Sequence, residues 1–162
     1  MPARVAAGVY SGSTSVILIG AISRFPEAAR ANFKARADIA SQDGVDGFVD
    51  KFVAGAFHPQ TSEQHPEIGA LTRDVMLRND KDAYAAAIHG LLEAPEINYS
   101  AITCPTLVLV GDEDHATPKA MADELGAAIS NSSVEVVQDG GHWCTLEQPK
   151  AIADQVRSFF GK

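Results

Sequence analysis

Two stretches of the chain combine an apolar run with side chains that could exchange a proton: VLVGDEDHATP at 108–118 and GGHWCTLEQP at 140–149. In open parallel α/β sheets, ligands bind beyond the carboxyl ends of the strands, where both stretches are expected to lie. A buried carboxylate beside an imidazole fixes the tautomer of the ring and stabilises its protonated form. The order of residues therefore predicts an acid–base pair between His142 and one of the acids at 112–114.

Each of these residues also has an ordinary structural interpretation. An aspartate after a strand usually stabilises a turn or the start of a helix, and Asp112 or Asp114 could cap the helix expected at 118–129. A histidine beside two glycines is often a plain loop residue, although two glycines also let the backbone turn sharply and present His142. The catalytic interpretation depends on the acid and the histidine following neighbouring parallel strands.

The elements that would position the pair follow from the hydrophobic pattern. Continuous apolar runs predict three buried parallel strands, at 15–20, 106–111 and 134–137. Helices are expected at 118–129 and 147–160, which makes the C-terminal part a βαβα unit. Four short amphipathic helices are expected between 26 and 94, starting near Pro26, Val45, Pro66 and Asp80. We therefore divide the chain into an N-terminal loop and first strand (1–25), a helical subdomain (26–94) and a C-terminal α/β part (95–162).

Composition excludes several classes of function. The chain has 162 residues, 46% of them hydrophobic, which suits a globular domain. A net charge of −8 without a basic patch argues against nucleic-acid binding. The two cysteines form no CxxC pattern, and His58, His65 and His89 show no metal-ligand spacing, so we expect no metal and no cofactor. Without a signal peptide or an apolar run long enough to cross a bilayer, the expectation is a cytoplasmic protein that does not bind membranes.

Further detail in the same stretches resembles the C-terminal part of the α/β-hydrolases, in particular the branch of enol-lactonases, haloperoxidases and esterases. The matching residues are Ile102-x-x-Pro105, TLVLVGDE at 106–113, Asp114-x-x-x-Pro118, Gly141-His142-Trp143 and Glu147-Gln148-Pro149 before a helix that ends in SFF. The resemblance covers about 15–162. It implies a partial α/β-hydrolase fold with about three parallel strands, flanking helices and a four-helix cap at 26–94.

The resemblance also implies roles for single residues. Asp114 would be the acid of a catalytic triad and His142 its base. Trp143 and the Glu147-Gln148-Pro149 run would be structural. Asp112 and Glu113 would face solvent or cap the next helix, and His115 could line the pocket. The substrate would be an ester, a lactone or a similar small carbonyl compound.

The chain departs from the family pattern at the nucleophile. These hydrolases carry it on a Gly-x-Ser-x-Gly elbow, and no glycine of this chain begins such a pattern. Ser11, Ser13 and Ser15 lie before the first strand, whereas the elbow follows a strand. We therefore expect a chain that is truncated relative to the family and is inactive alone or dependent on another chain. The expected partner is a second copy of the chain or a complementing N-terminal hydrolase half; the alternative is a non-enzymatic remnant acting as a dimerisation or small-ligand-binding module.

Overall fold

The computed structural model describes residues 12–161, and these form two compact units. The sheet unit comprises the chain before Phe25, the short segment Ala56–Thr61 and the chain from Glu96 onwards. The helical unit comprises Phe25–Gly55 and Ser62–Pro95. The segment Ala56–Thr61 thus belongs with the sheet although it lies between two stretches of the helical unit in sequence.

The sheet unit is built on three parallel strands within the described residues: β1 (Val16–Ile19), β2 (Thr106–Gly111) and β3 (Ser132–Val137). Their order in the sheet is β1-β2-β3, so β2 is central, and all six of its residues are buried. The predicted strands are confirmed, with β3 starting two residues earlier than its apolar core suggests. Among strands of the described residues, β1 and β3 each have a neighbour on one side only.

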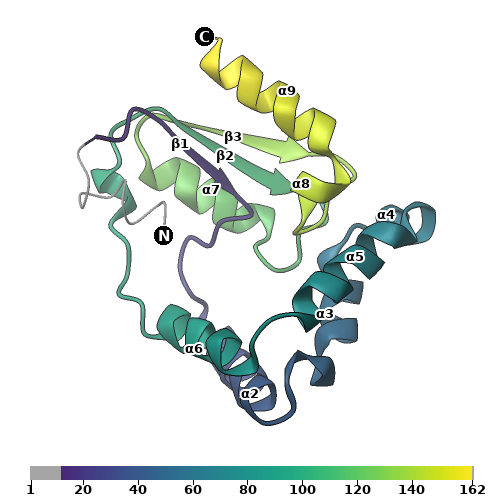
Figure 1. Cartoon of the computed structure of the whole chain (residues 1–162). Coiled ribbons are helices and arrows are strands. Elements are labelled where there is room, and N and C mark those ends of the chain that lie inside the picture. The colour runs from purple at the N-terminus through teal and green to yellow at the C-terminus, as the bar shows by residue number, and fades with distance from the viewer. Residues whose placement is uncertain (1–11, 162) are drawn as a thin grey trace. The chain divides into compact units, whose positions relative to one another are not determined.

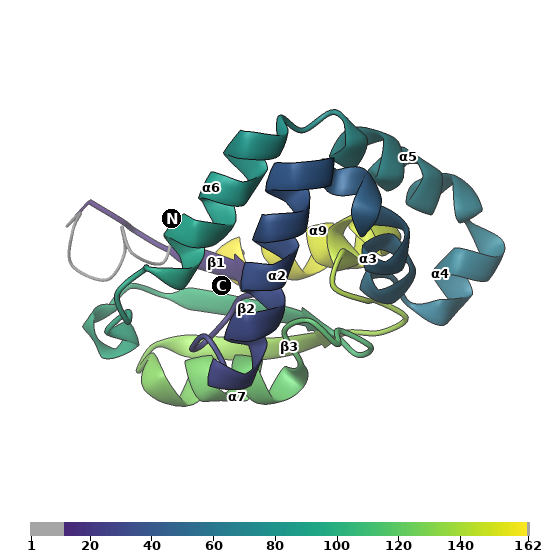
Figure 2. The same ribbon diagram turned by 90° about the horizontal axis from the view of Figure 1, so that it is seen from below.

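Helices cover both faces of this sheet. Alternate strand residues, among them Leu18, Val108 and Val110, pack with Leu125 and Ile129 of the segment containing α7 (Lys119–Ala128). The residues between them pack on α9 (Pro149–Phe160), which Figures 1 and 2 show on the opposite side of the strands from α7. Burial on both faces explains why the strands read as continuous apolar runs without alternation.

The C-terminal helical segment differs from the single predicted helix at 147–160. A short helix α8 (Cys144–Glu147) ends before Gln148, and α9 then begins at Pro149. Proline is favoured in the first turn of a helix, where its missing N–H removes no intrahelical bond. The proline at 149 therefore starts a new helix, and the residues before it form the separate short helix α8, which follows the His142 loop.

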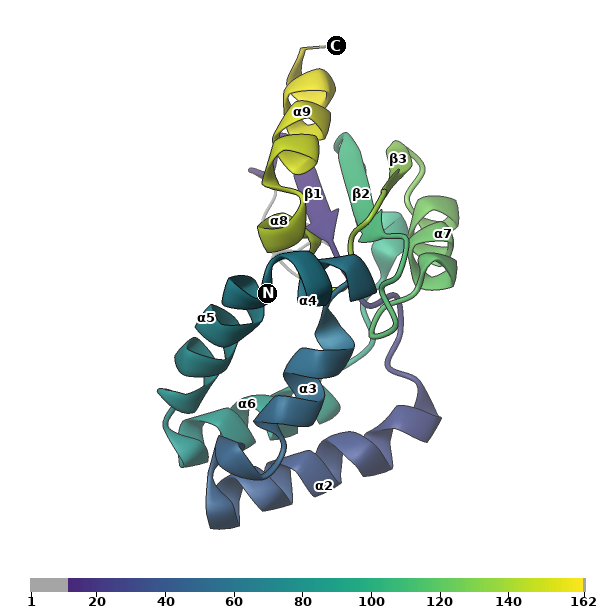
Figure 3. The ribbon, with the colours of Figure 1, turned by 90° about the vertical axis from the view of Figure 1, so that its right-hand side faces the viewer.

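The helical unit is organised around α2 (Glu27–Asp43) and α6 (Lys81–Leu92), which lie alongside each other (Figure 3). Ala37 of α2 and Ala85 and Ile88 of α6 form its buried cluster. The remaining elements are a 3-10 turn η2 (Val45–Gly47), α3 (Val49–Ala56), α4 (Pro59–Gln64) and α5 (Pro66–Leu77). A second 3-10 turn, η3 (Tyr99–Ala101), precedes β2 in the sheet unit.

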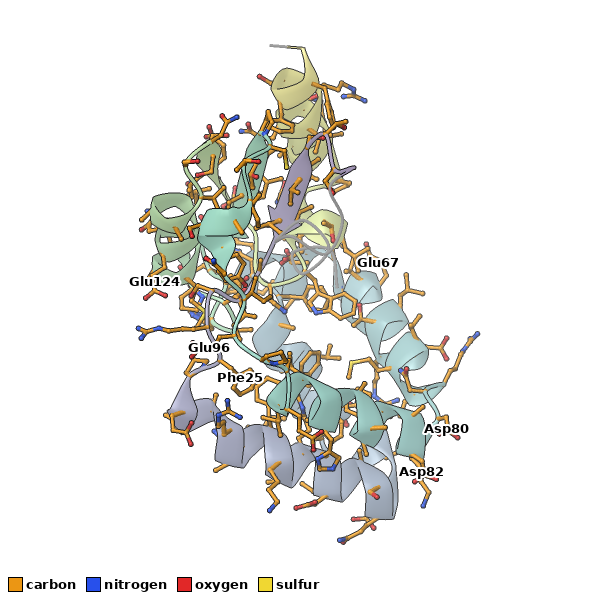
Figure 4. All side chains as sticks on the ribbon, turned by 90° about the vertical axis from the view of Figure 1, so that its left-hand side faces the viewer. Phe25, Glu67, Asp80, Asp82, Glu96 and Glu124 are labelled. Atoms are coloured by element: carbon orange, nitrogen blue, oxygen red, sulfur yellow. The ribbon has the colours of Figure 1, made fainter. Side chains whose placement is uncertain are left out.

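The sequence predicted four helices between 26 and 94, and the described chain has five α-helices that lie in or extend into this range. The additional helix is α4, whose sequence PQTSEQ has no apolar periodicity. The predicted start of the last helix is confirmed: the Asp80 carboxylate accepts bonds from the N–H groups of Asp82 and Ala83, at 3.1 and 2.8 Å. Figure 4 shows Asp80 and Asp82 at this end of α6.

Candidate active site

The carboxyl ends of the three strands meet at one edge of the sheet, and the predicted acid and base are in contact there. Asp114 lies three residues beyond β2, and His142 lies five residues beyond β3. The Nδ1 atom of His142 is 3.0 Å from Oδ2 of Asp114 and 3.2 Å from Oδ1. The expectation that neighbouring strands bring Asp114 and His142 together is therefore met in the structure.

The two side chains differ in exposure. The side chain of Asp114 is fully buried, whereas that of His142 is 27% exposed. Nδ1 faces the carboxylate, and Nε2 has no hydrogen-bond partner among residues 12–161. A carboxylate that accepts the Nδ1 proton leaves the lone pair of the ring on Nε2. The arrangement can therefore take a proton at Nε2 and stabilise the resulting charge through Asp114.

Thr117 completes the surroundings of the carboxylate. Its hydroxyl donates to Oδ2 of Asp114 at 2.8 Å, and its backbone N–H donates to Oδ1 at 2.8 Å. The N–H of Ala116 also donates to Oδ1, at 2.9 Å. Asp114 thus holds its own turn, which confirms the structural interpretation of this residue, and it contacts the histidine as the acid–base prediction requires.

These donors determine the ionisation of Asp114. Burial acts to raise the pKa of this carboxyl, but the hydrogen bonds from His142 and Thr117 outweigh burial and hold the pKa below its ordinary value of 3.8. A carboxyl whose pKa is depressed by folding stabilises the folded state above its unfolded pKa, and this stabilisation is lost as pH falls through the folded pKa. The carboxylate is therefore the form present at neutral pH.

We accordingly expect the free energy of unfolding to fall when the pH is lowered from about 5 to about 3, and to fall less in Asp114→Asn. The variant lacks the group whose protonation the folded state resists. Urea unfolding at several pH values measures both slopes. Parallel pH profiles for the two proteins would show that the hydrogen bonds to Asp114 do not favour its ionised form.

Gly20 brings the end of β1 into the site, beside the loops that follow β2 and β3. It follows β1 directly, has a positive φ of 54°, and its N–H donates to Leu109 O at 2.9 Å. A Cβ atom at this position would lie 3.3 Å from Nδ1 of His142 and 3.4 Å from Oδ2 of Asp114. Sequence reasoning missed Gly20, although a glycine at the end of a strand is a signal for close approach.

Asp112 is exposed, as one of its two predicted positions requires, and it does not cap the next helix, because α7 has Pro118 at its start with no side-chain cap. The carboxylate of Asp112 instead accepts bonds from the N–H groups of Asp139 and Gly140, at 3.2 and 3.0 Å. Its Cα lies on the loop of the acid and its partners lie on the loop of the base, so Asp112 connects the two.

The other candidates in this loop lie away from the pair. Glu113 is exposed as predicted, and its carboxylate is 3.3 Å from the ring of His115, whose side chain is 75% exposed. His115 therefore pairs with a solvent-facing acid.

Cys144 is fully buried, and burial together with Asp114 and Glu147 raises the pKa of its thiol to about 11. The reactive thiolate form of Cys144 is thus disfavoured at neutral pH.

Sequence comparison agrees with this geometry. The signature of the alpha/beta hydrolase family matches residues 2–155. The chain belongs to the alpha/beta hydrolase family. Among curated alpha/beta hydrolase relatives, the 3-oxoadipate enol-lactonase 2 of Acinetobacter baylyi is 27% identical over 129 residues, which are 78% of this chain and 47% of that protein.

Solved structures of other hydrolases share the fold. A thermophilic esterase from Thermogutta terrifontis, solved with malate bound, superposes with a TM-score of 0.84 at 27% identity, covering 91% of this chain and 55% of the esterase. The enol-lactonase from Burkholderia xenovorans LB400 gives a TM-score of 0.87 at 23% identity, covering 99% of this chain and 61% of that one. The chain therefore covers part of the alpha/beta hydrolase fold and spans about half the length of the relatives it matches.

No α-helix in residues 12–161 has both the length and the apolar composition needed to cross a membrane. The same residues contain no group of three or more His, Cys, Asp or Glu side chains placed to hold a metal ion.

Proposed function

We propose that this chain supplies the acid and the base of a serine-type hydrolase acting on an ester, a lactone or a similar small carbonyl compound. The observation that carries the proposal is the geometry of His142. Nδ1 is held by a buried carboxylate, and Nε2 lies on a partly exposed ring without a partner in the described chain. The alpha/beta hydrolase membership and the enol-lactonase and esterase relatives support the substrate class.

His142 would take and then return one proton, and Asp114 would stabilise the ring while it carries the charge. Nε2 of His142 would take the proton of an attacking hydroxyl as that oxygen forms its bond to the substrate carbonyl carbon. Asp114 would stabilise the imidazolium without itself becoming protonated. The imidazolium would then return the proton to the leaving oxygen as the tetrahedral intermediate collapses, which leaves the acyl group on the attacking oxygen and restores the base. A water molecule activated by His142 in the same way would then release the acid and regenerate the hydroxyl.

We further propose that the nucleophile comes from polypeptide outside these 162 residues. Ser15 lies before β1, whereas Gly20 beside His142 lies after it, and the five intervening steps of extended chain span about 16 Å. That separation prevents proton transfer from Ser15 to His142. Ser13 lies further towards the N-terminus, and Ser11 lies outside the described residues. Cys144 is buried as a thiol.

The partner that we propose is a second copy of the chain or a complementing N-terminal hydrolase half. Within the described residues, β1 and β3 are unpaired on their outer sides, and strands with free edges readily accept another strand. A measured mass in solution above that of one chain (17.1 kDa), or co-purification with a hydrolase segment that carries Gly-x-Ser-x-Gly, is the expected result. A stable monomer that binds neither would contradict the partner proposal.

The experiment for the catalytic proposal compares the purified chain with His142→Ala. We expect weak hydrolysis of p-nitrophenyl acetate that disappears in the variant, because an imidazole alone can still activate water. A fluorophosphonate probe should not label the chain. Equal hydrolysis by both proteins would remove His142 from the reaction and favour the non-enzymatic binding module. Stoichiometric labelling of a serine would contradict an external nucleophile.

A further inference from the structure

Glu147 connects two segments that are far apart in sequence. Its Oε1 atom accepts a bond from the backbone N–H of His58 at 2.6 Å, and its Oε2 atom accepts one from the N–H of Gly141 at 2.7 Å. His58 is 89 residues from Glu147, and Gly141 directly precedes His142. Both carboxylate oxygens are therefore used, one on each segment, in short charge-assisted bonds.

The same two segments are joined next to this carboxylate. The backbone N–H of His142 donates to the carbonyl oxygen of Ala56 at 2.8 Å. The rings of Phe57 and Trp143 lie with their centroids 6.2 Å apart. The segment Ala56–Thr61 belongs to the sheet unit with the histidine, so these contacts lie within one compact unit.

Gly141 shows how closely the two segments approach. A Cβ atom at this position would lie 2.7 Å from the carbonyl oxygen of Ala56, 2.7 Å from the carbonyl carbon of Phe57 and 2.7 Å from the amide nitrogen of His58. All three atoms are backbone, so they cannot swing away as a side chain could. The backbone beside His142 therefore packs directly on the backbone of the segment Ala56–Thr61, to which Glu147 is also hydrogen-bonded.

With Asp112 included, each N–H in the run 139–142 has a defined acceptor. Asp112 accepts the first two and Glu147 the third, and the carbonyl of Ala56 accepts the fourth. Asp112 connects this run to the loop of Asp114, whereas Glu147 connects it to the opposite neighbour, Ala56–Thr61. The backbone leading to His142 is thus hydrogen-bonded both to the loop of Asp114 and to the segment Ala56–Thr61.

We infer that Glu147 is a positioning residue for His142: its carboxylate fixes the Ala56–Thr61 segment against the backbone of the histidine and so holds the imidazole at Asp114. The inference rests on the proposed role of His142 as the base. It differs from a general structural role, because loss of Glu147 would disturb the ring as well as the backbone amides.

The test uses Glu147→Gln in the full chain. The amide keeps the size of the carboxylate but replaces one accepting oxygen with an NH₂ group, which cannot accept from a backbone N–H. We expect amide hydrogen exchange at Gly141 or His58 to accelerate on the order of 10-fold to 100-fold. We also expect the NMR resonance of the His142 Nδ1–H to broaden or disappear.

Three matched measurements serve as controls for this test. Glu63→Gln makes the same change at an exposed carboxylate that forms no hydrogen bond among the described residues, and it should alter neither signal. The amide of Gly140, held by Asp112, serves as an internal reference and should change little in Glu147→Gln. Glu147→Asp keeps the charge but shortens the side chain, and it should shift the same signals by less.

The possible outcomes distinguish a positioning role of Glu147 from a purely structural role, and they test the positioning role separately from the proposed function. Faster exchange with an unchanged ring resonance would make Glu147 a purely structural residue and overturn the inference, as would unchanged exchange. If Glu147→Gln does not fold, Glu147→Asp and the scalar coupling across the two hydrogen bonds in the unmodified chain decide the matter. Altered signals in a protein without His142-dependent hydrolysis would support the positioning geometry while contradicting the proposed function.

Discussion

Replacing Asp114 by Asn should lower the rate constant of His142-dependent ester hydrolysis about 10⁴-fold when the chain is combined with the nucleophile-bearing partner that we propose. The carboxylate accepts the proton on Nδ1 of His142, which leaves Nε2 free to act as the base. An asparagine NH₂ at the same place would donate to Nδ1, and the ring proton would then reside on Nε2. The ring would keep its position and lose its function.

The control for this variant is Glu113→Gln. Glu113 lies one residue away on the same loop, but it is exposed and pairs only with His115 among the described residues. The substitution changes the net charge of the loop equally and should leave the rate within about 2-fold, as expected for a surface pair of small energetic weight. In the chain alone, Asp114→Asn should also remove the Nδ1–H resonance of His142. A similar loss of rate in both variants would mean that loop charge, and not the tautomer of His142, controls hydrolysis.

The contact between Asp114 and His142 could be predicted because it depends on strand order. Residues that follow two adjacent parallel strands must meet at the same edge of the sheet, so the hydrophobic pattern of 106–111 and 134–137 predicts that an acid at 112–114 meets His142. The choice of Asp114 among these acids came from the resemblance to the α/β-hydrolases. The catalytic roles of the two residues are a proposal that this geometry supports.

The resemblance marked Glu147 as structural, but the hydrogen-bond partners of the supporting residues could not be found from strand order. Glu147 binds backbone groups 6 and 89 residues away. Every residue except proline has the same backbone N–H, so the sequence does not indicate which acceptor that group will find. Asp112 looks like any aspartate after a strand, and only the position of the Gly140 amide distinguishes a link between loops from a helix cap. Local patterns indicate elements, whereas these bonds depend on how distant loops pack.

The helical unit also contains a feature that the sequence did not predict. The helix α2 was predicted from its Pro26-Glu27 start and Ala-rich sequence, and α6 from apolar residues at helical spacing. The helix α4 has a polar sequence, and its first residues belong to the sheet unit together with Ala56 and Phe57. The sequence does not indicate that a segment between two helices of one unit is part of the other.

The second large effect that we expect is on stability: Gly111→Ala should lower the free energy of unfolding by about 3 kcal/mol. Gly111 is the last residue of β2, and a Cβ atom there would overlap the carbonyl oxygens of Gly140 and Gly141 and lie 2.6 Å from the carbonyl carbon of Gly140. These atoms belong to the backbone run that four hydrogen bonds hold in place. Relief of the overlap would therefore require moving the whole loop, including the bond from Glu113 N–H to the carbonyl of Gly140.

Gly90→Ala provides the opposite expectation from the same chemical change. Gly90 lies within α6, and no heavy atom within 4 Å would meet its added Cβ. Alanine in a helix interior is favoured over glycine by about 0.5–1 kcal/mol, so this variant should be slightly more stable. Urea unfolding of both variants measures the difference. A Gly111→Ala protein with the stability of the unmodified chain would show that the 139–142 run can shift freely, and the rigid support proposed for His142 would then be wrong.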